Sequence, residues 1–85
     1  MNRKQKKIFE SIFATPTKAN ILFSDLEKLT ISLGGQIVEG DGSRVKLSLN
    51  GVQFFAHRPH PNKEAKKYQI NDFREFLEKA GIKDE

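Results

Sequence analysis

The segment RVKLSLNGVQFFAH, residues 44–57, constrains the fold of this chain more than any other. From residue 44 to residue 49, polar and apolar side chains alternate, which is the pattern of a strand with one buried face. Asn50-Gly51 follows directly, and this dipeptide is the strongest short hairpin signal because both residues accept the positive φ angles of a type I′ turn. The segment therefore predicts two antiparallel strands, 44–49 and 52–57, joined by a two-residue turn.

The two-residue turn also predicts the register of the hairpin. The expected core-facing pairs are Leu49–Val52, Leu47–Phe54 and Val45–Ala56, and the expected pairs on the opposite face are Ser48–Gln53, Lys46–Phe55 and Arg44–His57. Directly opposed residues have Cβ atoms about 4.5–5.5 Å apart. Arg44 and His57 are therefore expected to be neighbours at one end of the uncovered face.

This pairing has two interpretations. A guanidinium does not stabilise a neighbouring imidazole, because it repels the protonated ring, and a functional site tolerates such a conflict. The other interpretation is a solvated strand end without a function. Taken alone, the register favours the solvated strand end.

Apolar residues at helical spacing predict three helices, over 3–14, 24–33 and 70–80, and a short strand is expected over 36–39. Ser24 and Glu27 have the spacing of a capping box at the start of the second helix. Gly81 is expected to cap the third helix, with Ile82 packing back. The prolines of segment 58–67 take it out of the sheet. The resulting order, α-α-β-β-β-α, predicts an α+β fold whose three-stranded antiparallel sheet is covered on one face by the two later helices.

The 85 residues predict a single domain, with an extra N-terminal helix and connector over 1–20 and a core over 21–83. The absence of cysteine excludes disulfides and thiolate metal sites. No apolar run approaches the roughly 18 residues of a membrane span, and Glu10 and Ser11 interrupt an otherwise signal-like N-terminus, so a cytoplasmic location is expected. The net charge of +4 and pI near 9.5 fit a polyanionic partner such as nucleic acid, and they fit equally a small basic domain that binds none.

Three segments carry a family resemblance: GDGSRVKLSLNG, FFAHRPHP and INDFREFLEKAGI. In this order they resemble the HicA toxins of bacterial toxin–antitoxin pairs, in particular a branch with G-S-R and H-R-P-H-P in place of the more usual G-S-H. The resemblance covers residues 22–83 and leaves the N-terminal helix outside. It implies a double-stranded-RNA-binding-domain-like fold, cleavage of mRNA without a metal or cofactor, and neutralisation by a HicB-like antitoxin.

Gly42 and Ser43 match the G-S of this family, but Arg44 stands where the usual catalytic histidine follows. His57 lies directly across the predicted hairpin from Arg44. We therefore hypothesise that an imidazole missing from one strand is supplied by its partner strand.

The expected site combines proton transfer with phosphate binding. A histidine suits proton transfer because its unperturbed pKa lies near 6.5, and arginine matches phosphate oxygens with a planar, permanently charged fork. We expect three catalytic groups: His57 as base or acid, Arg44 as a phosphate clamp, and His60 as a second proton-transfer group or substrate contact. We expect four RNA-binding groups: Ser43, Lys46, Arg58 (a second phosphate clamp) and Phe55 (stacking on a base).

Several alternatives stay open from the sequence. Phe55 is favoured to pack against the N-terminal helix rather than to stack on a base. A metal site from His57, His60 and Glu64 is not expected, because nothing fixes its geometry across the prolines. The N-terminal RKQKK run either extends the RNA surface or keeps an apolar helix soluble. As a whole, the chain is either a ribonuclease toxin, a non-catalytic RNA-binding module or a protein-interaction domain that uses a sheet face or edge.

Overall fold

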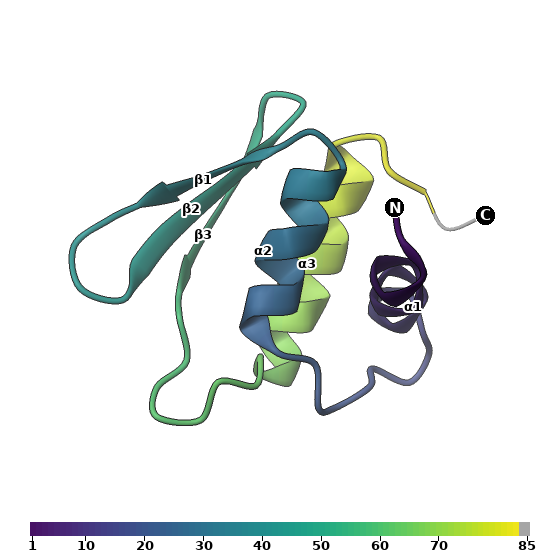
Figure 1. Cartoon of the computed structure of the whole chain (residues 1–85), viewed down its shortest axis with the longest axis horizontal. Helices are drawn as coiled ribbons and strands as arrows, with labels where there is room; N and C mark the ends of the chain where they lie inside the picture. The colour runs from purple at the N-terminus through teal and green to yellow at the C-terminus, as the bar shows by residue number, and fades with distance from the viewer. Residues whose placement is uncertain (84–85) are drawn as a thin grey trace.

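The computed structural model describes residues 1–83 and has the predicted order of three helices and a three-stranded antiparallel sheet (Figure 1). The helices are α1 (Arg3–Ile12), α2 (Phe23–Ser32) and α3 (Lys67–Lys79). The strands are β1 (Gln36–Glu39), β2 (Arg44–Leu49) and β3 (Val52–His57). β2 lies in the centre of the sheet, between β1 and β3. No helix within residues 1–83 is long and apolar enough to span a membrane.

The predicted hairpin register is confirmed at every pair, from Leu49 opposite Val52 to Arg44 opposite His57. Asn50 and Gly51 have φ angles of 51° and 82°, and positive values at both positions are what a type I′ turn requires. The Asn50 side chain also donates a hydrogen bond of 2.8 Å to the carbonyl of Ala80. The tip of the hairpin is therefore held against the end of α3.

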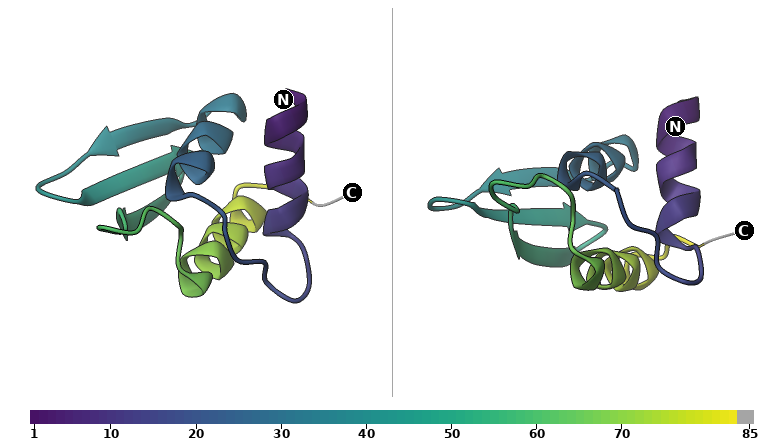
Figure 2. Two further views of the ribbon diagram at one scale, coloured as in Figure 1. Left: turned by 60° about the horizontal axis from the view of Figure 1, so that its bottom comes forward. Right: turned by 90° about the horizontal axis from the view of Figure 1, so that it is seen from below.

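The sheet packs on α2 and α3 through one face, and α1 lies on the far side of these two helices, crosswise to them (Figures 1 and 2). Between the sheet and the helices, Phe54 of β3 meets Phe73 and Phe76 of α3, with ring centroids 5.9 and 5.7 Å apart. Aromatic contacts of this kind add about 0.5–1.5 kcal/mol each to the effect of burial. The fully buried side chains around them come from several elements: Leu26, Leu29, Leu47, Ile70 and Leu77.

The apolar face of α1 packs on α2 and α3, not on the sheet. Ile12 is completely buried there. Arg74 of α3 donates hydrogen bonds to the carbonyls of Ile12, at 2.7 Å, and Ala14, at 3.3 Å, which satisfies acceptors that the end of a helix leaves free. The favoured expectation that Phe55 packs against this helix is therefore wrong. Phe55 is 71% exposed on the opposite face of the sheet.

The start of α2 differs from the prediction, and the expected capping box of Ser24 and Glu27 is wrong. The helix begins at Phe23 and its N-cap is Leu22, which makes no side-chain capping bond. Instead, the N–H of Phe23 donates to the carbonyl of Lys63 at 3.0 Å, beside an isolated antiparallel pairing of Leu22 with Glu64. A segment distant in sequence thus satisfies a backbone donor that a side chain usually satisfies.

The other helix ends are close to the predicted positions. α1 ends at Ile12 rather than at residue 14, and α3 begins at Lys67 rather than at residue 70. The first turn of α3 was missed because it is polar and adds nothing to the apolar stripe. Gly81 has a φ of 85°, and the N–H of Ile82 bonds back to the carbonyl of Leu77 at 2.9 Å, as predicted for this end of the helix.

Substitution of the two adjacent phenylalanines of β3 tests the sheet faces. Phe54→Ala is expected to lower the free energy of unfolding by about 3–5 kcal/mol, because it empties a site in the core. Phe55→Ala, the matched control one residue away, is expected to change it by less than about 0.5 kcal/mol, because the ring is exposed. Urea denaturation followed by circular dichroism measures both. Equal losses would contradict the register.

Candidate active site

The predicted site residues lie in two shallow grooves on opposite sides of the sheet. Arg44, Lys46, Phe55 and His57 line the first, which we call the sheet-face groove. Ser43, Arg58 and His60 line the second, the helix-side groove, together with residues of α2. Successive side chains of a strand point to opposite faces, so the alternation of β3 carries His57 to one groove and the next residue, Arg58, to the other.

The imidazole of His57 is linked to the segment that precedes β2. The Oγ of Ser43 lies 3.2 Å from Nδ1 of His57. Ser43 is itself held by its carbonyl, which accepts a 2.8 Å hydrogen bond from the N–H of Arg58 and so extends the pairing of β2 with β3. Within residues 1–83, Nε2 of His57 has no hydrogen-bond partner. The contact with Ser43 therefore orients the ring and leaves Nε2 as the nitrogen that can exchange a proton.

Arg44 begins β2 beside His57, at the turn that follows β1. The N–H of Arg44 donates to the carbonyl of Asp41 at 3.0 Å, and its carbonyl accepts from Gly40 at 2.9 Å. Asp41 also lines the sheet-face groove, so its charge is mixed. In the part of the chain that the structure describes, neither Arg44 nor Lys46 forms an ion pair. Both cations are therefore free to contact an anion.

Arg58 has two carboxylate partners on the helix side of the sheet. Its Nε and Nη2 donate to Glu27 of α2 at 3.1 and 2.5 Å, and its Nη1 and Nη2 donate to Glu39 of β1 at 2.5 and 2.7 Å. The hydrogen bond from Arg58 lowers the pKa of Glu39, and the bonds to Glu39 and Glu27 raise the pKa of Arg58. Arg58 thus ties β1 and the end of β3 to α2. Its role as a phosphate clamp stays a prediction.

Gln69 was not foreseen from the sequence. It is 3% exposed, its Nε2 donates to the carbonyl of His57 at 2.9 Å, and its Oε1 accepts from the N–H of Lys66 at 2.9 Å. A buried amide needs such partners. The signal in the sequence is a polar residue directly before the apolar stripe that begins at Ile70, just outside the helix predicted over 70–80. Gln69 is a positioning residue for the strand end that carries His57.

His60 is exposed on the segment between β3 and α3, and it shares the helix-side groove with Ser43 and Lys63. It does not line the groove of His57. The alternative metal site is not found: within residues 1–83, no three His, Asp or Glu side chains are grouped so that they hold a metal ion.

Among known proteins, residues 23–82 match the family described as "HicA toxin of bacterial toxin-antitoxin". The match runs from the start of α2 to Ile82 and leaves α1 outside. No curated protein and no solved structure matches the chain significantly.

The ion pairs of Arg58 make the stability depend on pH. Because the pKa of Glu39 is lowered in the folded state, its carboxylate contributes stability above its ordinary pKa of 4.5, and this contribution is lost as the pH falls through the folded-state pKa. Glu39→Gln is therefore expected to be less stable than wild type near pH 7, with a difference that shrinks below about pH 4.5. Urea denaturation at a series of pH values measures this.

The matched control for this experiment is Glu75→Gln, which removes one carboxylate from the exposed pair of Glu75 with Lys79. It is expected to change the free energy of unfolding by less than about 0.5 kcal/mol. A Glu39→Gln variant that follows wild type at every pH would show that the pair of Arg58 with Glu39 does not stabilise the fold.

Proposed function

The chain belongs to the HicA toxin family of bacterial toxin–antitoxin systems, and from this premise we propose that it is an endoribonuclease that cleaves mRNA without a metal ion and is neutralised by a HicB-like antitoxin. The observation that carries the proposal is the position of His57. Its imidazole lies on the face of the sheet that no helix covers, oriented by Ser43 and next to Arg44 in the register. A base and a cation side by side are what metal-free RNA cleavage needs.

In the proposed reaction, Nε2 of His57 takes the proton of a ribose 2′-hydroxyl. The O2′ attacks the adjacent phosphorus, and the bond from phosphorus to the 5′-oxygen of the next nucleotide breaks. The 5′-oxygen leaves with the electron pair and takes a proton from the imidazolium or from water. The products are a 2′,3′-cyclic phosphate and a 5′-hydroxyl end, and no oxidant, metal or cofactor takes part.

Arg44 is assigned to the charge that develops on the phosphate oxygens. A guanidinium stays charged and offers two parallel donors to two oxygens, and this kind of electrostatic stabilisation is usually the largest single contribution to catalysis. Lys46, on the same face of β2, is assigned to the RNA backbone.

Phe55 is assigned to stacking on a base. With packing against α1 excluded, its exposed ring lies opposite Lys46 and two residues before His57 on the same face of β3. Aromatic side chains stack on any base and contribute about 1–3 kcal/mol. An RNA strand that passes along the sheet-face groove meets the ring and the imidazole in succession.

Two residues of the helix-side groove receive supporting roles in this proposal. His60 is assigned to contact with the substrate rather than to proton transfer, because it lines the helix-side groove and His57 lines the sheet-face groove. Arg58 is assigned to positioning, because its guanidinium already binds Glu27 and Glu39.

A second candidate function is a non-catalytic RNA-binding module. Arg44 favours it, because it follows Gly42-Ser43 where the family resemblance places a histidine. The two candidates differ in what the removal of His57 does: it stops cleavage in the first and changes little in the second.

His57→Ala is expected to lower the rate of RNA cleavage about 10²–10⁴-fold, because it removes the proton-transfer group, and to abolish growth arrest when the protein is induced in bacteria. Cleavage of a labelled transcript by purified protein measures the rate. Gln53→Ala is the matched control, since Gln53 lies on the same strand and the same sheet face as His57 but at the other end of the strand. Undiminished cleavage by His57→Ala would refute its catalytic role, and wild-type protein that binds RNA but leaves it intact would favour the module.

Arg44→Ala is expected to lower kcat about 10²–10³-fold, by the loss of transition-state stabilisation. Arg44→Lys is expected to recover only part of the rate, because an ammonium keeps the charge and loses the fork. Single-turnover cleavage at saturating enzyme, with RNA affinity measured separately, divides the effect between binding and chemistry. If Arg44→Ala changes affinity alone, Arg44 is a binding residue and not a catalytic one.

A further inference from the structure

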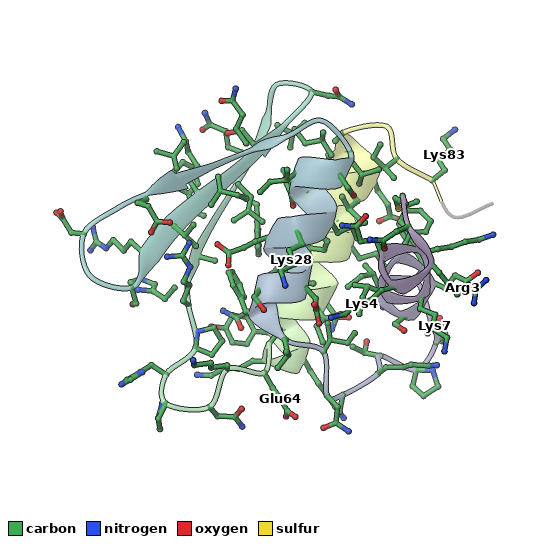
Figure 3. The ribbon with its side chains drawn as sticks, in the orientation of Figure 1. Arg3, Lys4, Lys7, Lys28, Glu64 and Lys83 are labelled. Carbon is green, nitrogen blue, oxygen red and sulfur yellow. The ribbon has the colours of Figure 1, made fainter. Side chains whose placement is uncertain are left out.

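The proposed active site leaves a group of cations on and beside α1 without a role. Arg3, Lys4 and Lys7 are exposed on α1, and Lys28 is exposed on the neighbouring α2 (Figure 3). We call these four residues the α1 cationic surface. Within residues 1–83, none of the four forms an ion pair.

These charges work against the helix that carries them. The first turn of α1 holds no acidic residue, and the N-cap is made by neutral groups, Asn2 and Gln5. Cations near the N-terminus of a helix oppose its dipole, and Arg3 and Lys7 repel one another at a spacing of four residues. The one carboxylate of α1, Glu10, lies in its second half. An uncompensated repulsion of this kind is typical of a functional surface.

The position of α1 separates these cations from the active site. α1 lies behind α2 and α3, away from the uncovered face of the sheet (Figure 2), in a molecule whose longest extent is 36 Å. The α1 cationic surface therefore does not extend the sheet-face groove. It also lies mostly in the part of the chain that precedes the family match, which starts at residue 23.

The packing of α1 argues against a lipid surface as the partner. A helix that binds a membrane inserts an apolar face, but Ile12 is completely buried, and Ile8, Phe9 and Phe13 pack against the core. The exposed residues of α1 are its cations and Glu10. The cations suit a partner with closely spaced negative charges and no demand for shape or sequence, which is the phosphate backbone of a nucleic acid.

We propose that the α1 cationic surface binds the phosphate backbone of RNA as a second contact, separate from the sheet-face groove. The inference rests on the proposed function, because that function supplies the polyanion. A long RNA contacts both surfaces and is held during cleavage, whereas a short oligonucleotide occupies the groove alone.

The test compares two double variants with equal net charge. Lys4→Gln with Lys7→Gln removes part of the surface, and Lys18→Gln with Lys67→Gln removes two exposed cations outside it that also form no ion pair within residues 1–83. Each is combined with His57→Ala, so that the RNA stays intact, and binding of a long single-stranded RNA is measured by fluorescence anisotropy at several salt concentrations. The first variant is expected to reduce the slope of log affinity against log salt by about 1.4, since each contact with a single strand contributes about 0.7. The second is expected to leave it unchanged.

A second measurement uses both double variants with His57 intact. Lys4→Gln with Lys7→Gln is expected to slow the cleavage of a long transcript at low concentration and to leave the cleavage of a short oligonucleotide unchanged. The inference would be overturned by equal slopes for the two variants, or by equal slowing on long and short RNA. It would also be overturned if Lys4→Gln with Lys7→Gln lost binding to vesicles of anionic lipid and kept its binding to RNA. Failure of the proposed function is distinguishable: RNA binding with the expected slopes but no cleavage refutes the ribonuclease and leaves this surface standing, whereas no RNA binding by wild type refutes both.

Discussion

The two-residue turn at Asn50-Gly51 sets the geometry on which the remaining structure depends. Because both residues have positive φ angles, Leu49 lies opposite Val52, and each later pair of the hairpin follows from that one. A shift by one residue would turn Phe54 out of the core and His57 toward the helices. The hydrogen bond from Asn50 to Ala80 extends the constraint to the end of α3. The same turn therefore determines both the burial of Phe54 in the core and the position of His57 in the proposed active site.

The end of β3 shows how a small domain combines the two demands. His57 and Arg58 are neighbours in the chain, but strand alternation sends their side chains to opposite sides of the sheet. Arg58 binds Glu27 and Glu39 and holds the strand end to α2 and β1. Gln69 holds the carbonyl of His57 from α3. The imidazole can therefore stand exposed on a fixed backbone, which proton transfer in a defined geometry requires.

The cations of this basic chain are distributed over two separate surfaces. Arg44 and Lys46 lie on the sheet, within the region that matches the toxin family, and Arg3, Lys4 and Lys7 lie on the helix outside it. The extra helix is anchored by burial of Ile12 and by hydrogen bonds from Arg74. Its charged side is thus presented on a rigid support. The proposed contact there would add to the affinity for RNA without altering the groove where cleavage is proposed.

Local signals in the sequence determined the order of elements, the hairpin register, the meeting of Arg44 with His57 and the end of α3 at Gly81, because alternation, turn residues and caps act over a few neighbouring positions. Tertiary structure alone decided the rest. The start of α2 is satisfied by Lys63 rather than by a side chain, and α1 packs on the helices and leaves Phe55 exposed. Gln69 and the carboxylates that hold Arg58 come from segments 12 to 31 residues away from their partners. Such partners are brought together only by packing, and no local pattern encodes which distant groups will meet.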